Sequence, residues 1–204
     1  MVKFDSVEDA IADLRSGKAI IVMDNEGREN ESDLVFAGEK ATPELMAFTI
    51  RHTAGFICVC VEEKRLKQLE IPLMFENNTD PNGTQYTVTV DAKYNVSTGI
   101  SAHDRAMTVK SLADYSIIDP GAFTKPGHMV PLKPHSDGLK SRTGHTEAVY
   151  TICKLAGFNP VGVLSELINE DGTMMRKEDT FKFAKEYNLK FISIDDLVKY
   201  AREH

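Results

Sequence analysis

The chain contains an uninterrupted apolar run, Ala19-Ile20-Ile21-Val22-Met23, followed directly by a charged segment. A short run of this kind, rich in β-branched side chains and bounded by polar residues, indicates a strand buried on both faces. Comparable runs occupy residues 56–61 and 161–164. Strands buried on both faces need helices on either side, so these runs predict a central β-sheet packed between helices.

Helical patterns alternate with the apolar runs in an irregular order. Ser6 and Ser101 stand where a helix begins, and Gly17 and Gly157 stand where one ends. The predicted helices cover residues 7–16, 42–54, 102–113, 146–156, 179–187 and 196–203; further strands are predicted at 84–91, 129–130 and 191–194, and a proline-containing loop at 119–127. Without a regular βα repeat, this order predicts one α/β (α+β) sandwich domain over residues 1–204, with a mixed β-sheet core flanked by helices.

Composition narrows the classes of protein to consider. The chain has 204 residues, 42% of them hydrophobic, and a formal net charge of −7, which argues against a nucleic-acid or anionic-membrane surface. No segment approaches the ~20 apolar residues of a membrane span, and no signal peptide is recognisable. The three cysteines are too few for a disulfide framework, so we expect a reduced, cytoplasmic protein.

The charged segment after the first apolar run is a candidate functional site. Arg28-Glu29-Asn30-Glu31-Ser32-Asp33, with Asp24 and Glu26 ahead of it, places five carboxylates within ten residues. Crowded carboxylates repel each other unless a divalent cation or a shared proton relieves them, and loops at strand ends are common places for binding groups. The alternative is a solvated acidic loop, which the charge pattern alone does not exclude.

A second candidate is Arg142-Thr143-Gly144-His145-Thr146-Glu147, which leads into a predicted helix. Backbone amides at a helix start, a hydroxyl and a guanidinium together can hold a phosphate, and His145 can ligate a metal beside it. The alternative is an ordinary helix start with a chance histidine. Neither a Walker loop nor a dinucleotide-binding glycine pattern is present, so nucleotide binding is disfavoured.

Two single residues are further candidates for proton transfer. Glu166 follows the apolar run at 161–164, where a carboxylate is either solvated at the edge of the sheet or desolvated in a site with a raised pKa. His128 follows Lys125-Pro126-Gly127 and is a loop histidine unless it faces the same cleft. Residue chemistry alone therefore indicates a metal-dependent enzyme acting on a small phosphorylated molecule.

Taken together, these segments resemble the 3,4-dihydroxy-2-butanone-4-phosphate synthase family of riboflavin biosynthesis. The resemblance rests on motifs in family order from about residue 20 to the C-terminus: Arg28-Glu29-Asn30-Glu31 with Asp33, Glu76-Asn77-Asn78-Thr79, Thr98-Gly99-Ile100-Ser101-Ala102 with Asp104-Arg105, Pro126-Gly127-His128, Gly144-His145-Thr146-Glu147-Ala148, Leu155-Ala156-Gly157-Phe158 and Asp171-Gly172-Thr173-Met174. One departure is Ser32, where the family's acidic loop is expected to carry glycine. The chain ends without the cyclohydrolase domain that bacterial relatives can carry, so we expect the monofunctional form.

The resemblance implies a role for each matching residue. It implies that Glu29 and His145 ligate magnesium or manganese, as a pair of ions. It implies substrate contacts to ribulose 5-phosphate from Arg28, Glu29, Asp33, Arg142, Thr143, Gly144 and Thr146. It implies catalytic roles for His128, Glu166 and Glu31, and a homodimer with its sites near the interface. The implied reaction produces 3,4-dihydroxy-2-butanone 4-phosphate and formate.

Two other functions are compatible with the same residues. A metal-dependent sugar-phosphate isomerase or aldolase needs similar enediol chemistry but releases no formate. A non-catalytic sugar-phosphate sensor needs the phosphate site but has no use for proton-transfer groups such as His128 and Glu166. Formate release from ribulose 5-phosphate distinguishes the synthase from both.

Overall fold

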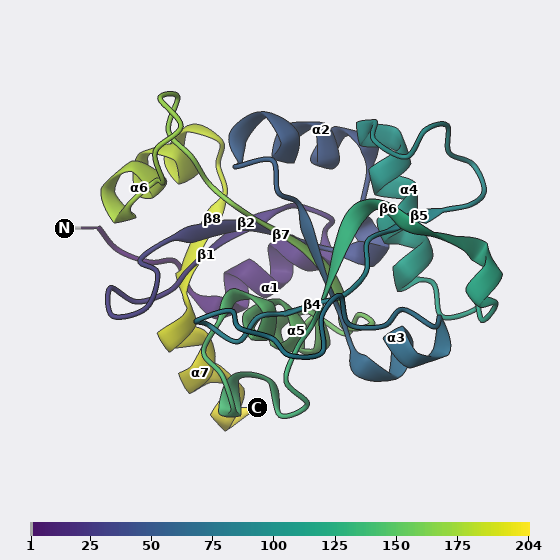
Figure 1. The fold of residues 1–204 in the computed structure, drawn as a ribbon. Helices are drawn as coiled ribbons and strands as arrows, with labels where there is room; N and C mark the ends of the chain where they lie inside the picture. Colours follow the sequence, from purple (N-terminus) through teal and green to yellow (C-terminus); the bar gives the residue numbers. More distant parts are fainter. Residues whose placement is uncertain (1) are drawn as a thin grey trace.

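A mixed β-sheet runs through the centre of the protein, which we describe from a computed structural model over residues 2–204 (Figure 1). Its strands are β1 (Ile20–Met23), β2 (Ser32–Ala37), β3 (Cys58–Val61), β4 (Gln85–Tyr86), β5 (Val90–Ala92), β6 (Phe123–Lys133), β7 (Val161–Glu166) and β8 (Lys190–Ser193). The order is β4-β6-β3-β7-β2-β1-β8, and β5 pairs with β6. The β1/β8 and β3/β6 pairs are parallel and the others are antiparallel.

Helices cover both faces of the sheet (Figure 1). One layer contains α1 (Val7–Arg15), α5 (His145–Leu155) and α7 (Ile194–Glu203); the other contains α2 (Pro43–His52), α3 (Glu63–Gln68), α4 (Ala102–Ala113) and α6 (Lys177–Glu186). Successive residues of β1 pack against opposite layers: Ile20 and Val22 belong to the first core, Ile21 and Met23 to the second. The predicted mixed sheet flanked by helices is confirmed.

Three of the predicted helix starts are also confirmed, whereas α6 and α7 each begin two residues before the predicted position. The side chains of Ser6, Thr42 and Ser101 each accept a hydrogen bond from the backbone N–H three residues further on. Such a cap stabilises a helix by about 1 kcal/mol because it satisfies a donor that has no partner inside the helix. No helix among residues 2–204 is long and apolar enough to cross a bilayer.

Two predicted loops are wrong in part. The charged segment 28–33 was expected to be a loop, but β2 begins at Ser32 and pairs with both β1 and β7. Residues 119–127 were expected to be a loop, but β6 begins at Phe123 and continues past Pro126. A register shift on the β5 side of β6 explains how the strand tolerates Pro126, since proline cannot donate to a regular ladder.

The predicted strand at 84–91 forms two short strands instead. β4 and β5 both pair with β6, but on different stretches of it, and residues 87–89 separate them. The short helix α3 was not predicted, because six residues are too few to show a helical period.

Candidate active site

A cavity gathers residues from segments that are far apart in the sequence. It lies where the β1–β2 connection, the N-terminus of α5 and strands β3, β4, β6 and β7 meet. Its lining consists of Arg28, Glu29, Asp33, Cys58, Thr84, Tyr86, Leu132, Arg142, His145, Thr146, Leu164 and Glu166. Both charged segments singled out in the sequence therefore contribute to one site.

The acidic β1–β2 connection is shaped by the buried carboxylate of Asp24. This carboxylate accepts hydrogen bonds from the Arg28 guanidinium at 2.8 Å and from the backbone N–H groups of Glu29 at 3.1 Å and Glu31 at 2.9 Å. Arg28 also pairs with the Glu29 carboxylate. Asp24 thus holds the connection in a fixed shape and turns Glu29 toward the start of α5.

At the centre of the cavity, one imidazole lies between two carboxylates. The His145 Nδ1 atom is 3.5 Å from the Glu29 carboxylate, and Nε2 is 3.9 Å from Asp33 Oδ1. His145 and Asp33 are both buried, and these two facing atoms, Nε2 and Oδ1, have no hydrogen-bond partner among the described residues. Buried polar atoms without partners are costly, which indicates that something else engages them.

The charges of the cluster shift its pKa values in opposite directions. The hydrogen bond from His145 and the charge of Arg28 outweigh burial and lower the pKa of Glu29 to about 2. Burial raises the pKa of Asp33, because the ionised form is desolvated. Burial lowers the pKa of His145, but Asp33, Glu29 and Asp24 outweigh it, and the net shift is upward. The cluster therefore favours a positive charge at its centre.

This donor set fits a divalent cation. Ligand atoms of Asp24, Glu29 and His145 all lie within 4.8 Å of one another. Imidazole nitrogen with carboxylate oxygens suits magnesium or manganese, whereas the absence of cysteine from this group disfavours soft metals. Two of the three are the ligands implied by the resemblance; Asp24 was only counted among the crowded carboxylates.

The N-terminus of α5, whose first backbone N–H groups have no partner within the helix, lies at the same cavity. Its N-cap residue, Gly144, provides no side-chain cap. A Cβ at Gly144 would lie 2.2 Å from the Arg142 guanidinium, so glycine allows the close approach of that cation. Thr146 lines the cavity, whereas Thr143 is exposed beside it. The arrangement is suited to an anion.

Arg142 is held in place by residues on both sides of the cavity. Its guanidinium donates to the buried Glu147 carboxylate at 2.5 Å, to the Thr84 hydroxyl at 3.0 Å and to the Asn82 carbonyl at 3.0 Å. These bonds occupy part of its five donors, and the remaining N–H groups are available to a ligand. Arg142 is thus fixed before any ligand binds.

Glu166 faces the cavity and not open solvent. It ends β7 directly opposite Asp33 on β2, and it belongs to the cavity lining. Its charge contributes to the raised pKa values of Asp33 and Glu31, after burial as the main cause. The alternative that Glu166 is merely solvated at the edge of the sheet is therefore disfavoured.

Two predicted catalytic residues lie outside the cavity lining. Glu31 stands at the rim, 3.8 Å from the Arg176 guanidinium. His128 lies on β6 next to β5, four residues before Leu132, which does line the cavity. Four residues of strand correspond to about 13 Å, at ~3.3 Å per residue. His128 therefore lies away from the part of the cavity that Glu29 and His145 form.

Sequence reasoning missed two residues that support the acidic connection. The Asn82 amide donates to the Glu29 carboxylate at 2.7 Å, and Arg176, which precedes α6, donates to the carbonyls of Glu29 at 3.0 Å and Asn30 at 2.6 Å. In the sequence, Asn82 precedes Gly83, a pair typical of a turn, and nothing near Arg176 indicates a site. Both come from segments that only the fold brings to the site.

Ser32 joins β2 to α6, and Cys58 contributes a thiol to the cavity. The Ser32 hydroxyl is buried and accepts a hydrogen bond at 3.1 Å from the Thr180 hydroxyl on α6, so serine ties β2 to α6. Cys58 lines the cavity, and burial, followed by the charges of Glu166 and Asp33, raises the pKa of its thiol well above the usual value. Cys58 is therefore a neutral thiol, poorly suited to nucleophilic attack.

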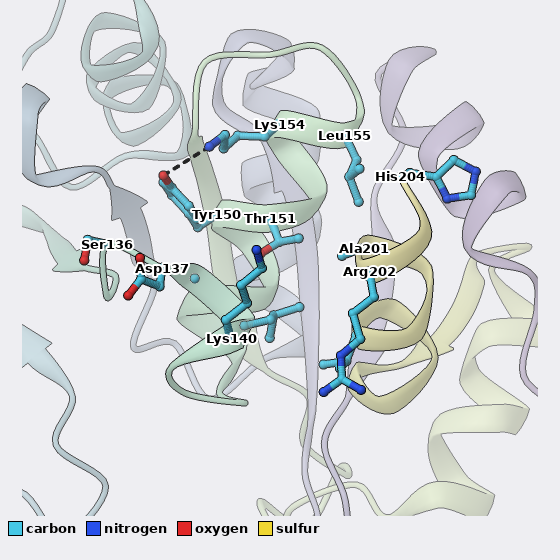
Figure 2. A pocket seen from close by; sticks show the side chains of 13 residues that line it. Ser136, Asp137, Lys140, Tyr150, Thr151, Lys154, Leu155, Ala201, Arg202 and His204 are labelled. Atoms are coloured by element: carbon cyan, nitrogen blue, oxygen red, sulfur yellow. Dashed lines mark hydrogen bonds between the residues drawn. The ribbon is translucent and has the colours of Figure 1, made fainter.

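A second cavity of about 390 Å³ lies between the 138–140 turn, α5 and α7 (Figure 2). Its basic side chains are Lys140, Lys154 and Arg202, and the side chain of Lys154 turns toward Tyr150. It contains none of the acid–histidine groups described above. The acid–histidine groups suited to metal binding and proton transfer therefore lie at the first cavity and not at this one.

The fold and site define an α/β protein with a candidate divalent-metal centre beside an anion-binding helix start. A family model described as 3,4-dihydroxy-2-butanone 4-phosphate synthase matches residues 8–200. The synthase of Klebsiella pneumoniae is 48% identical over 202 residues, which are 98% of this chain and 92% of that relative. The chain belongs to the 3,4-dihydroxy-2-butanone 4-phosphate synthase family.

Solved structures of the family agree with this assignment. A structure of 3,4-dihydroxy-2-butanone 4-phosphate synthase in complex with two magnesium ions has a TM-score of 0.94 and 39% identity, with 98% of both chains covered. The Candida albicans synthase has a TM-score of 0.90 and 45% identity, again with 98% of both chains covered.

Proposed function

We propose that the chain converts D-ribulose 5-phosphate to L-3,4-dihydroxy-2-butanone 4-phosphate and formate, the step that supplies the four-carbon unit of riboflavin. The observation that carries the proposal is the Glu29–His145–Asp33 cluster, in which His145 and Asp33 are buried, placed beside two arginines and the start of α5. The five-carbon substrate is divided into a four-carbon product and formate, so no oxidant or reductant is needed.

The substrate phosphate is anchored at the start of α5 in this proposal. Arg142 and Arg28 provide positive charge, and Gly144, Thr143 and Thr146 provide backbone and hydroxyl donors. An anion binds well at such a helix start because the N–H groups and the helix dipole both favour it. Asp33 and Glu29 line the same cavity, where they can meet the substrate's hydroxyl groups.

Glu29 and His145 would hold magnesium or manganese, as a pair of ions in keeping with the two magnesium ions of the related structure. When bound, a divalent cation supplies Lewis-acid stabilisation of negative charge on the substrate oxygens. The protein's contribution is to fix the ligands: Asn82 and Arg28 hold the Glu29 carboxylate, and Asp24 holds the backbone that carries it.

Proton transfer is assigned to Glu166, Glu31 and His128. The proton beside the substrate ketone has to be removed by a positioned base, and the leaving hydroxyl has to be protonated by an acid. Glu166 is placed for this inside the cavity, and Glu31 at its rim has its pKa raised by burial and by Glu29. Both carboxyl groups can therefore exchange protons with a bound sugar phosphate.

We infer that His128 serves the cavity of a second copy, in a homodimer. It lies outside the lining of its own cavity, and the loop packed against it exposes two large apolar side chains, Tyr94 (62% exposed) and Ile100 (52% exposed). Exposed apolar groups gathered near a functional residue are typical of an interface. We also infer one domain over residues 1–204, of which Met1 lies outside the described range, and a cytoplasmic location, supported by three free, buried cysteines.

The homodimer is tested by complementation between two inactive variants. Glu29→Gln and His128→Ala are co-expressed with different affinity tags, and the doubly tagged dimer is purified. If each site combines residues of both copies, this dimer contains one intact site and has about half of the parental activity, whereas each single variant is inactive. An inactive mixed dimer would show that His128 works within its own chain.

The proposed reaction is tested by measuring formate released from ribulose 5-phosphate. Release is expected with magnesium or manganese, is expected to stop with EDTA, and is expected to return when the metal is restored. An isomerase would consume the substrate without producing formate, and a sensor would bind it without turnover. Full formate release after rigorous metal removal would contradict the metal assignment.

A further inference from the structure

The side chain of His128 contacts a buried carboxylate to which the proposed reaction gives no role. Asp91, on β5, accepts a hydrogen bond from the backbone N–H of His128 at 2.8 Å through Oδ1. Its other oxygen, Oδ2, lies 2.6 Å from the His128 Nδ1 atom. The side chain of Asp91 is only 9% exposed, whereas that of His128 is 41% exposed. One carboxylate therefore contacts both the backbone N–H and the imidazole ring of His128.

The loop before α4 covers this pair. Gly99 lies so close that a Cβ there would be 2.1 Å from Asp91 Oδ2 and 2.6 Å from His128 Nδ1, and its φ of +97° also favours glycine. The loop is fixed in turn by Asp104, which accepts hydrogen bonds from the N–H groups of Ser97 at 3.1 Å and Gly99 at 3.0 Å. The Nδ1 side of the imidazole is thus enclosed, and Nε2 is left on the open side.

We propose that Asp91 is a positioning residue for the synthase reaction, which fixes the neutral imidazole of His128 with its proton on Nδ1 and Nε2 free to accept a proton. An ionised carboxylate only accepts hydrogen bonds, so the Nδ1 atom facing it has to carry the hydrogen. The second ring nitrogen is then a lone-pair acceptor directed outward. This inference rests on the proposed role of His128 in proton transfer.

Because Asp91 contacts His128 through both of its oxygens, Asp91→Asn tests which ring nitrogen has to carry the hydrogen. In the Asn variant the amide oxygen accepts the backbone N–H of His128, which only an acceptor can satisfy. The NH₂ group then faces Nδ1 and donates to it, so the imidazole is fixed in the opposite tautomer, with its hydrogen on Nε2. The variant keeps the shape and the hydrogen bonds and reverses only the position of the proton.

Asp91→Asn is expected to lower kcat by at least ~100-fold, the scale of general acid–base catalysis, with KM changed less than about threefold. Nitrogen-15 NMR of the imidazole is expected to show the Nδ1–H tautomer in the parent and the Nε2–H tautomer in the variant. This readout does not depend on turnover, and a merely structural role would not produce it.

Two further variants act as controls. His103→Ala removes the exposed histidine of another Asp–His contact, with Asp104 at 3.3 Å, and is expected to keep parental activity. Asp91→Ala removes the carboxylate without imposing a tautomer, so it is expected to retain more activity than Asp91→Asn. Circular dichroism of each variant shows whether the fold is kept.

The outcomes separate this inference from the proposed function. An active His128→Ala variant would overturn the role of His128 itself. An inactive His128→Ala variant together with an active Asp91→Asn variant, or an unchanged tautomer in Asp91→Asn, would overturn the positioning role of Asp91 alone. If Asp91→Asn unfolds, the tautomer of His128 in the parent protein tests the positioning role instead. An Nε2–H signal in the parent would contradict the inference.

Discussion

Glu29→Gln is expected to reduce formate release by at least ~1,000-fold, because a metal ion held in the site contributes several kcal/mol to the transition state. Glutamine keeps the size of the side chain and can still accept from Asn82, but it removes the negative charge that a divalent cation requires. Manganese binding, measured by electron paramagnetic resonance, is expected to weaken in parallel. His145→Ala is expected to lose activity and metal binding to a similar degree.

The two variants differ in their effect on stability. Glu29→Gln removes a partly exposed carboxylate whose charge is stabilised by His145 and Arg28, so a small loss of stability is expected without metal. His145→Ala leaves the buried Asp33 without its neighbouring positive charge and is expected to unfold more easily. Glu26→Gln, an exposed carboxylate of the same connection, is the matched control. Normal manganese binding by Glu29→Gln would refute the ligand assignment.

Glu166→Gln is the second change with a large expected effect. The amide preserves the shape and hydrogen-bonding capacity of a residue that lines the cavity beside Asp33, but it cannot exchange a proton. We expect turnover at least ~100-fold slower than the parent, with substrate and metal affinity nearly unchanged. Solvent deuterium exchange into bound substrate identifies which step is blocked.

Glu170→Gln is the control for this variant, since Glu170 is an exposed carboxylate four residues beyond Glu166. It is expected to behave like the parent in every assay. More than about a tenth of parental turnover in Glu166→Gln would remove that carboxylate from the proton transfers. Glu31 and His128 would then be the remaining candidates for the base.

The sequence predicted the core elements well and failed where the site begins. Ile20 to Met23 alternate between two buried layers, a pattern that only a central strand produces. The strand β2 was missed because its first residues, Ser32 and Asp33, belong to a charged segment, and their burial depends on neighbouring strands. β6 was missed in part because Pro126 normally ends a strand and is tolerated here at a shift of register.

Only those site residues that belong to a recognisable local sequence pattern could be predicted. Arg28, Glu29 and Asp33 on one side and His145 and Thr146 on the other were identified from two charged segments, and the fold brings them together. Arg176 and Asn82 were not found because their contacts span 147 and 53 positions of the chain. The pairing of His128 with Asp91, 37 positions apart, had no signal for the same reason.

The hydrogen bonds that Asp24 accepts within the β1–β2 connection have a consequence for ligand affinity. Fixing the backbone of one residue costs roughly 1–2 kcal/mol of conformational entropy. Because Asp24 already bonds to Arg28, Glu29 and Glu31 in the protein alone, this cost is met when the chain folds and not when a ligand arrives. Metal and sugar phosphate therefore meet an ordered surface, and their affinities reflect the charge and placement of its oxygen and nitrogen atoms.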